Sequence, residues 1–241
     1  MRFRLNIRSG IQTPEKKRHY NAGLFTRVAR EYDSATRAMS LGRDQAWKRW
    51  LVNALPPLAH PHCVDLACGT GDVTAALARR FPDARILGID LTPAMIEVAR
   101  QRWDLPNVEF RVADMCRSGI DDGWADVVTG SYALRNAPVL DEALAEVRRV
   151  LKPGGYAAFL DFAKACAHWR QSLQIPLLRV WGGFWGVVLH GGPEHAYIAE
   201  SLRQFPDRAA LRNQFNRHGF HLDQARDCFG GMLEILVFRR E

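Results

Sequence analysis

Three aspartates and one glycine-rich turn occupy positions from which a chain could bind a small ligand. Asp65, Asp90 and Asp114 each end a short stretch with the apolar or alternating character of a β-strand. The turn CGTG at residues 68–71 follows the first stretch, and a helix-like segment follows the turn. Glycines let the backbone turn tightly and approach a ligand, and a carboxylate about 20 residues further on can accept hydrogen bonds from ribose hydroxyls. This spacing predicts a ligand that contains a nucleoside.

The turn lacks part of the glycine pattern of a dinucleotide site. The pattern G-x-G-x-x-G would need a third glycine where Thr74 stands. Asp72, at the start of the predicted helix, would repel a phosphate while stabilising the helix end. Its charge suits a ligand that carries a positive charge. S-adenosylmethionine, with a sulfonium and an amino group, fits both observations.

A second polar pair, Arg135 and Asn136, lies in SYALRNAP (131–138), directly after the apolar run ADVVTG. Strand ends in open α/β sheets face the ligand, so we expect this pair beside the methyl group of the cofactor. If the methyl acceptor is a phenol, a fixed guanidinium can stabilise its phenolate form. The guanidinium itself stays protonated, so it is a poor general base. A water oriented by Asn136, or His190 or His195, is the candidate base. In-line methyl transfer needs no metal, and none is expected.

Alternating strand and helix signals predict the scaffold that carries these residues. Apolar spacing predicts helices within residues 20–55, which Pro56 and Pro57 end. The alternation beyond them predicts a parallel sheet with helices on both faces, closed by an antiparallel hairpin. The sequence KPGG at 152–155 is expected to end the helix before it. The predicted strands are 63–67, 84–90, 108–114, 125–133, 156–162, 221–229 and 231–239, and the predicted helices among them are 72–81, 92–103, 141–151 and 207–220.

The expected fold class is α/β, an open and mostly parallel sheet with N-terminal helices and an inserted cap. An insert rich in tryptophan and glycine interrupts the alternation, which separates it from the core. The expected segments are an N-terminal helical cap at 1–57, a cofactor-binding core at 58–164, a substrate cap insert at 165–205, and a final helix with strands at 206–241 that complete the core.

Bulk composition is that of a globular protein with its own core. The chain has 241 residues, 47% of them apolar, which suits one large domain with an added cap. Five scattered cysteines without a C-x-x-C pair predict reduced thiols. No run of about 18 apolar residues occurs, and the N-terminus lacks the apolar core of a signal peptide. These features predict a cytoplasmic protein without a transmembrane helix.

The formal net charge of +7 favours an anionic partner: nucleic acid, acidic lipid headgroups or a phosphorylated substrate. The densest basic runs, EKKRH at 15–19 and RRVLK at 148–152, are expected to be solvated faces rather than binding patches. No basic stripe interleaved with aromatic residues occurs. Residues 131–134 read SYAL, not the Pro-rich motif of enzymes that methylate base amino groups. We therefore expect no nucleic-acid partner.

Four motifs resemble those of class I S-adenosylmethionine-dependent methyltransferases: DLACGTGD, GIDLTPAMIEVAR, ADM and LKPGG. The resemblance implies a Rossmann-like sheet, S-adenosyl-L-methionine as cofactor and S-adenosyl-L-homocysteine as product. It implies Asp65 and the loop at 69–71 at the methionine part, Asp90 at the ribose, and Asp114 with Met115 at the adenine. The expected cofactor-binding residues are Asp65, Ala67, Gly69, Thr70, Gly71, Asp90, Leu91, Met95, Asp114, Met115 and Ser131.

Further stretches resemble the ubiquinone and menaquinone biosynthesis C-methyltransferase family, which methylates a ring carbon of a polyprenylated quinol. They are VAREYD…MSLG…WK (28–48), LRN (134–136), ESLRQFPD (200–207) and GG (230–231), in the order found in the family. The resemblance implies that five residues lie near the substrate: Tyr32, Arg135, Asn136, Tyr197 and Arg203. The catalytic candidates are Tyr32, Arg135, Asn136 and His195.

The chain departs from this family pattern where the substrate would sit. Ala133 replaces a usual glycine, and Tyr132 replaces a common phenylalanine. Ala35 with Thr36, Asp44 and His195 replace the common Met-Asn, His and Tyr. The acceptor is therefore either a quinol or another phenolic or polyketide-like natural product.

Several interpretations stay open. Arg135 forms either part of the reaction site or a structural ion pair, Tyr32 could belong to the core, and His195 could bind only backbone. Besides a methyltransferase for small molecules and one for nucleic acid, the third functional class is a non-catalytic subunit that binds the cofactor. The aromatic residues of 165–200 form a cap core, a tunnel for an isoprenoid tail, or a contact at a membrane interface, where tryptophan favours the headgroup level. Peripheral membrane contact and a homodimer are both compatible with the sequence.

Overall fold

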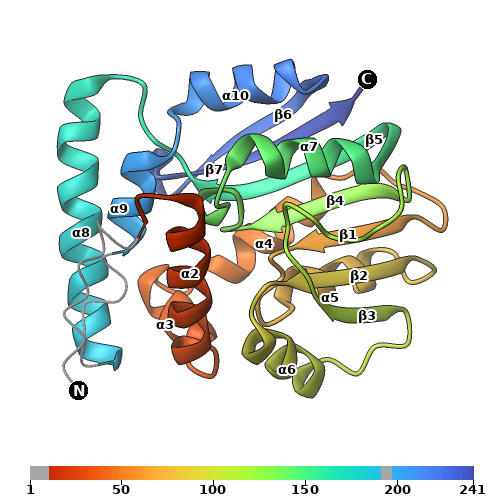
Figure 1. Cartoon of the computed structure of the whole chain (residues 1–241), viewed down its shortest axis with the longest axis horizontal. Coiled ribbons are helices and arrows are strands. Elements are labelled where there is room, and N and C mark those ends of the chain that lie inside the picture. Colours follow the sequence, from red (N-terminus) through yellow and green to blue (C-terminus); the bar gives the residue numbers. More distant parts are fainter. Residues whose placement is uncertain (1–10, 191–196) are drawn as a thin grey trace.

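The computed structural model describes residues 11–190 and 197–241, without the side chains of residues 189 and 190. Seven strands in this part of the chain form one sheet (Figure 1): β1 (His62–Leu66), β2 (Arg85–Asp90), β3 (Val108–Val112), β4 (Ala125–Ser131), β5 (Leu151–Phe162), β6 (Phe220–Cys228) and β7 (Leu233–Arg240). The strand order is β3-β2-β1-β4-β5-β7-β6. Pairs among β1 to β5 are parallel, and β7 pairs antiparallel with β5 and β6. The predicted sheet with its terminal hairpin is confirmed.

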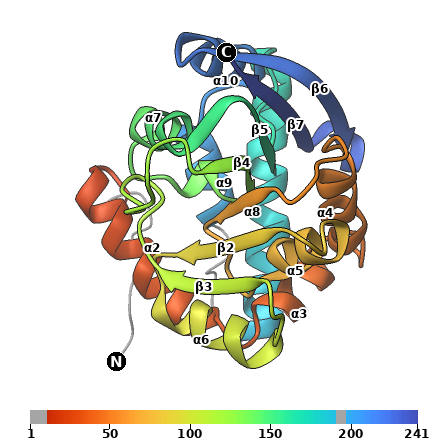
Figure 2. The ribbon, with the colours of Figure 1, turned by 90° about the vertical axis from the view of Figure 1, so that its right-hand side faces the viewer.

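Helices cover both faces of the sheet, as the strand and helix alternation predicted (Figure 2). On one face, α7 (Leu140–Val150) and α10 (Arg208–Arg217) pack against the sheet. On the other face lie α4 (Asp44–Asn53) and α5 (Asp72–Arg80). Helix α6 (Pro93–Arg102) packs beside β3. The inner parallel strands are thus buried from both sides, which is the usual condition of such sheets, whereas the edge strand β3 stays largely exposed.

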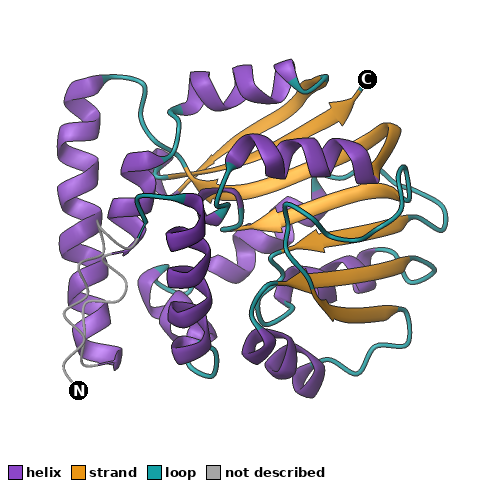
Figure 3. Cartoon of the chain, in the orientation of Figure 1, coloured by secondary structure: helices purple, strands orange, loops and turns teal. Residues whose placement is uncertain are grey.

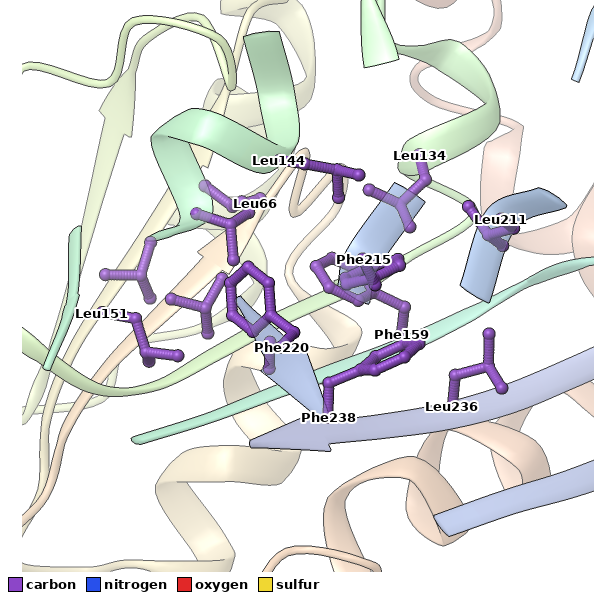
Figure 4. Close-up of a cluster of buried hydrophobic side chains, with 14 of the residues drawn as sticks. Leu66, Leu134, Leu144, Leu151, Phe159, Leu211, Phe215, Phe220, Leu236 and Phe238 are labelled. Atoms are coloured by element: carbon purple, nitrogen blue, oxygen red, sulfur yellow. The ribbon is translucent and has the colours of Figure 1, made fainter. Parts of the chain in front are cut away.

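A phenylalanine cluster anchors the antiparallel end of the sheet (Figure 4). Phe159 of β5, Phe238 of β7, Phe215 of α10 and Phe220 of β6 are all at most 2% exposed. The Phe215 and Phe238 rings stack with centroids 3.8 Å apart. Full burial of one such ring contributes about 1.5–3 kcal/mol, so this cluster fixes the hairpin against the parallel strands.

Four helices stand beyond the carboxyl edge of the parallel strands (Figures 1 and 3). They are α2 (Pro14–Val28), α3 (Tyr32–Met39), α8 (His168–His190) and α9 (Tyr197–Gln204). Helix α2 starts where the Thr13 hydroxyl accepts a hydrogen bond from the Lys16 N–H at 3.3 Å, with Pro14 at the first helical position. Helix α8 contacts α3 and α9, and Trp181 Nε1 donates to the Met39 carbonyl at 3.2 Å.

Two stretches differ from their predicted structure. The KPGG stretch at 152–155 follows the end of α7 at Val150, but it belongs to β5, which begins at Leu151 and not at residue 156. The register of β5 with β4 shifts between Ala125 and Val127, which accommodates these residues in the strand. The region of α8 is one continuous helix although it contains Pro176. In the described part of the chain, none of the helices combines the length and apolar character needed to cross a membrane.

Candidate active site

A cavity that is open to solvent lies where the strand order reverses between β1 and β4. Ligands of open α/β sheets bind at such a switch point, beyond the carboxyl ends of the strands. We call it the strand-end cavity. Eight of the eleven residues expected to bind the cofactor line it: Ala67, Gly69, Asp90, Leu91, Met95, Asp114, Met115 and Ser131.

Asp90 ties the glycine turn to the end of β2. Its Oδ2 accepts a hydrogen bond from the Gly69 N–H at 3.0 Å, and its Oδ1 accepts one from the Thr92 N–H at 2.8 Å. Burial raises the pKa of the Asp90 carboxyl, although these two backbone donors partly oppose the shift. The carboxylate therefore stands fixed at the cavity wall and keeps free lone pairs for a ligand.

Asp114 forms the opposite acidic point of the cavity wall. Its Oδ1 accepts a hydrogen bond from the Cys116 N–H at 2.9 Å, and its Oδ2 lies 2.9 Å from Arg18 Nε. Arg18 also lines the cavity, and Lys17 beside it is only 9% exposed. The prediction that the run 15–19 is a solvated face is therefore wrong for these two residues.

The two glycines of the turn serve different purposes. Gly69 has φ +55°, and a side chain there would meet open space. Gly71 has φ +84°, and a Cβ there would lie 2.8 Å from the Trp103 ring and 2.9 Å from the Phe110 ring. Gly69 thus leaves the cavity wall bare, whereas Gly71 permits the packing of α5 against its neighbours.

Asp65, Thr70 and Gly71 do not line the strand-end cavity. Asp65 accepts hydrogen bonds from the Thr74 and Thr129 hydroxyls at 2.7 and 2.8 Å, and burial raises its pKa to about 6. The Thr70 hydroxyl donates to Asp33 Oδ1 at 2.6 Å. In this structure these residues support the turn from behind.

Asp72 has its charge balanced within the protein. Its carboxylate lies 2.7 Å from Lys48 Nζ and 2.9 Å from Arg102 Nη1, and it accepts from Gln45 Nε2 at 2.6 Å. Burial alone would raise the pKa of Asp72, but the two cations hold it below its usual range. Asp72 does not line the cavity. The interpretation that the charge of Asp72 selects a cationic ligand is wrong, because Lys48 and Arg102, which come from other helices, already balance this charge.

A second cavity lies among the cap helices. We call it the helix-lined cavity. Most of its wall is apolar, and Arg135 is the one charged side chain among the described residues that line it. Its apolar wall consists of Leu24, Phe25, Val28, Met39, Trp47, Phe162, Leu178, Trp181, Ile198, Phe229 and Leu233.

Phe25, Tyr32, Tyr132 and Asn136 line both cavities and form a shared wall. Asn136 Nδ2 donates to the Tyr132 carbonyl at 2.7 Å. Asn136 Oδ1 is buried and has no hydrogen-bond partner in the part of the chain that the structure describes. Tyr132 has φ +56°, a strained conformation for a side chain of this size. A ligand in either cavity would meet this wall.

Arg135 is held in place on several sides. Its Nε lies 3.4 Å from Asp161 Oδ1, and its Nη1 donates to the Ser201 hydroxyl at 2.5 Å. The guanidinium lies between the Phe162 and Tyr197 rings, 5.3 and 5.9 Å from their centroids. The structural ion pair and the position beside a cavity, which the sequence left as alternatives, occur together.

No carboxylate or imidazole lines the described part of the helix-lined cavity. Burial raises the pKa of Tyr32, Tyr132 and Tyr197, so their hydroxyls stay protonated near neutral pH. His195 lies outside the described residues, as does the side chain of His190. The described residues can therefore orient an acceptor and stabilise negative charge.

The sequence reasoning missed several lining residues. Arg18, Asn21, Ala22 and Phe25 all come from α2, and their spacing of three and four residues places them on one helix face. This periodicity could have identified the lining residues from the sequence, but the basic run at 15–19 was interpreted as a solvated face. The other missed lining residues of the strand-end cavity are Thr92, Ala113, Tyr132 and Pro138.

The fold is that of S-adenosylmethionine-dependent methyltransferases. A methyltransferase from Aquifex aeolicus matches with a TM-score of 0.62 and 14% identity, over 87% of this chain and 98% of that chain. Geranyl diphosphate C-methyltransferase from Streptomyces coelicolor A3(2) matches with a TM-score of 0.62 and 15% identity, over 81% of this chain and 79% of that chain. Both likenesses concern the fold alone.

The chain belongs to the ubiE/COQ5 methyltransferase family, whose model matches residues 13–236. It is 34% identical to the ubiquinone/menaquinone biosynthesis C-methyltransferase UbiE of Acidiphilium cryptum, over 91% of this chain and 90% of that protein. The enzyme of the same name from Rubrivivax gelatinosus is 35% identical, over 90% and 85%. The family resemblance seen in the motifs is confirmed, and the protein is an enzyme that uses S-adenosyl-L-methionine.

Proposed function

We propose that this enzyme transfers a methyl group to a ring carbon of a quinol in ubiquinone or menaquinone biosynthesis. The observation that carries the proposal is the shared wall between the two cavities. It separates a cavity with acidic points from an apolar cavity whose described wall carries a single charge, the cation of Arg135. An uncharged ring with an acidic phenol suits the second cavity, and two relatives are named for this reaction.

The residues of the strand-end cavity suit the proposed cofactor. The Asp90 carboxylate would accept hydrogen bonds from the ribose hydroxyls, as acidic residues at this strand end do. Asp114 with Met115 would hold the adenine, and Ala67, Gly69 and Ser131 would face the methionine part. The bare backbone at Gly69 provides the close approach that such a ligand needs. The cofactor supplies an electrophilic methyl group on its sulfonium.

Arg135 would stabilise the phenolate form of the acceptor. A buried cation lowers the pKa of a neighbouring phenol, and the resulting negative charge makes the ring carbon nucleophilic. The new C–C bond forms as the S–C bond breaks, and the ring carbon then loses its proton. We propose that a water at the unpaired Asn136 Oδ1 accepts this proton, and that the protonated Tyr32 hydroxyl helps to orient the acceptor.

The departures from the family pattern do not all bear on the acceptor. Thr36 and Tyr132 line the helix-lined cavity. Ala35 and Ala133 are buried and line neither cavity, and Asp44 pairs with Lys48 at 3.3 Å. Two side chains therefore give this cavity its own shape. A quinol with a long prenyl tail also implies that the enzyme meets its acceptor at a membrane, as a peripheral protein.

Methyl transfer from labelled cofactor to a panel of reduced quinols and soluble phenols tests the proposal, with products read by mass spectrometry. We expect a carbon-methylated quinol. Arg135→Ala should lose at least about 100-fold in rate, as expected for removal of a preorganised charge. Arg217→Ala, which removes an exposed cation from α10, is the matched control. Product from soluble phenols only would assign the enzyme to other phenolic natural products. Cofactor binding without any product would contradict catalysis.

A further inference from the structure

We infer that helix α8 is the surface with which this enzyme lies on an anionic lipid bilayer. The inference rests on the proposed function, because it concerns how an acceptor with a prenyl tail reaches the helix-lined cavity. It assigns a contact surface to particular residues.

The outer face of α8 carries a continuous exposed apolar stripe. Its side chains are 56–71% exposed and recur at three- and four-residue spacing, which places them on one face of the helix over about 28 Å. Seven of the ten large apolar side chains exposed in the described chain belong to it. We call it the α8 stripe: Trp169, Leu173, Leu177, Val180, Phe184, Val187 and Val188. Exposed apolar patches of this kind mark contact sites on soluble folds.

The inner face of α8 is already occupied. Ile175 and Leu178 are buried in the main core cluster, and Leu178, Trp181 and Gly182 line the helix-lined cavity. Helices α3 and α9 contact α8, which stands at the side of the molecule in Figure 1. The helix is therefore apolar on both faces, whereas a surface helix of a globular protein is normally polar on its outer face. Within the described residues, the α8 stripe is the part of this helix that no other element covers.

The positive charge on and beside α8 favours an anionic lipid surface as the partner that covers the α8 stripe. Arg170 and Arg179 are exposed on α8, the helix contains no Asp or Glu, and Arg37 and Arg43 are exposed on and just after the neighbouring α3. Helices with an apolar face and basic flanks lie in the headgroup region of anionic membranes, where arginine side chains reach the phosphates. Two copies paired through the stripe would bring basic borders together without a carboxylate on α8 to balance them.

Helix α8 separates the helix-lined cavity from the proposed lipid surface. The same helix walls the helix-lined cavity with its inner face and would contact lipid with its outer face. A prenyl tail that leaves the cavity past α8 would enter the bilayer directly, so the ring could be methylated while the tail stays in lipid.

Vesicle flotation of the full chain tests this inference. Vesicles of phosphatidylcholine alone are compared with vesicles that also contain phosphatidylglycerol. We expect binding to the anionic vesicles, weakened by salt. The double variant Val180→Glu, Phe184→Glu should bind at least about tenfold more weakly, since it places charge on the inserted face. Leu222→Glu on β6, also an exposed apolar position, should bind like the wild type.

Two further readouts separate the outcomes. Cofactor affinity should be equal in all variants, which shows that they are folded. Sedimentation in solution detects pairing: a wild-type dimer that the double variant dissociates, without vesicle binding, would assign the stripe to a second copy and overturn the inference. Equal vesicle binding by wild type and double variant would also overturn it. Stripe-dependent binding without quinol methylation would instead contradict only the proposed function.

Discussion

The strand-end cavity and the helix-lined cavity are built in different ways. The strand-end cavity is lined mainly by residues at or just after the ends of β1, β2, β3 and β4, with one wall from α2. The helix-lined cavity takes most of its wall from α2, α3, α8 and α9, which are distant in sequence, and the rest from α4 and from residues at or after the ends of β4, β5 and β6. A frame of strand ends suits a ligand that stays the same across a fold, whereas replaceable helices suit an acceptor that varies.

The two cavities also differ in charge. The strand-end cavity has two carboxylates, Asp90 and Asp114, of which Asp114 is paired with Arg18, and is therefore acidic in sum. The only charged side chain among the described residues of the helix-lined cavity is Arg135. Each cavity thus offers charge opposite to that proposed for its ligand: a cationic cofactor on one side and a phenolate on the other. Substitutions should therefore affect the binding or reaction of one ligand and leave the other unchanged. Asp90→Ala, Asp161→Asn and Tyr32→Phe test this division, and Lys17→Met tests the stability of α2, which lines both cavities.

The largest effect is expected from Asp90→Ala. It removes the carboxylate that orders the Gly69 and Thr92 N–H groups and would accept the ribose hydroxyls. We expect cofactor affinity to fall by about 100-fold, since hydrogen bonds to charged groups contribute about 1.5–3 kcal/mol each. Titration calorimetry measures this, with the exposed Asp83→Ala as control. Unchanged affinity would show that the strand-end cavity is not the cofactor site.

Lys17→Met tests the cost of burying a lysine on α2. Burial, followed by the nearby Arg135, lowers the pKa of Lys17 to about 8. Since the unfolded state keeps the proton up to higher pH, wild-type stability should rise between about pH 8 and pH 10.5. At pH 7 the variant should be more stable by about 2 kcal/mol, and this advantage should shrink toward pH 10.

Urea unfolding at both pH values measures the effect of Lys17→Met. Lys16→Met is the matched control, because Lys16 is exposed next to Lys17 on the same helix. A gain of the same size in both variants would mean that burial of Lys17 is not the cause.

Asp161→Asn should affect catalysis and leave the cofactor alone. Asp161 accepts a hydrogen bond from the backbone N–H of Arg135 at 3.0 Å and pairs with the Arg135 guanidinium. The substitution therefore loosens the hold on this cation. We expect kcat to fall about tenfold with cofactor affinity unchanged, because Arg135 keeps its charge and loses only its fixed position. Asp227→Asn breaks a more exposed pair with Arg208 and serves as control. Equal losses of kcat and cofactor affinity would deny the division between the cavities.

The smallest effect is expected from Tyr32→Phe, in the shared wall. Burial raises the pKa of Tyr32, so its hydroxyl donates a hydrogen bond and does not act as a base near neutral pH. The rate should fall less than about tenfold, and both limbs of the pH–rate profile from about pH 6 to pH 9 should stay in place. A limb that disappears in the variant would identify Tyr32 as the titrating group.

The same contrast explains what could be predicted from the sequence. Asp90 is the last residue of β2 and Gly69 lies three residues after the end of β1, so local patterns placed them at the correct edge of the sheet. Asp72 was misjudged because its partners Lys48 and Arg102 lie on helices 24 and 30 residues away, a proximity that spacing alone does not contain. Lys17 was misjudged because a basic run is normally solvated.

Helix α8 shows a second limit of sequence patterns. Its composition indicated a cap, but an aromatic helix with glycines gives no sign of which side faces the protein. Trp181 turns inward to the helix-lined cavity, whereas Trp169 and Phe184 are more than half exposed. Only the packing of α3 and α9 against one side decides between them.

The shared wall has a thermodynamic consequence. Phe25, Tyr32, Tyr132 and Asn136 each touch both cavities, so a ligand that orders them in one cavity changes what the other ligand must still order. By linkage, the factor by which the cofactor changes acceptor affinity must equal the factor by which the acceptor changes cofactor affinity. Donor and acceptor would therefore report on each other's occupancy before any methyl group moves.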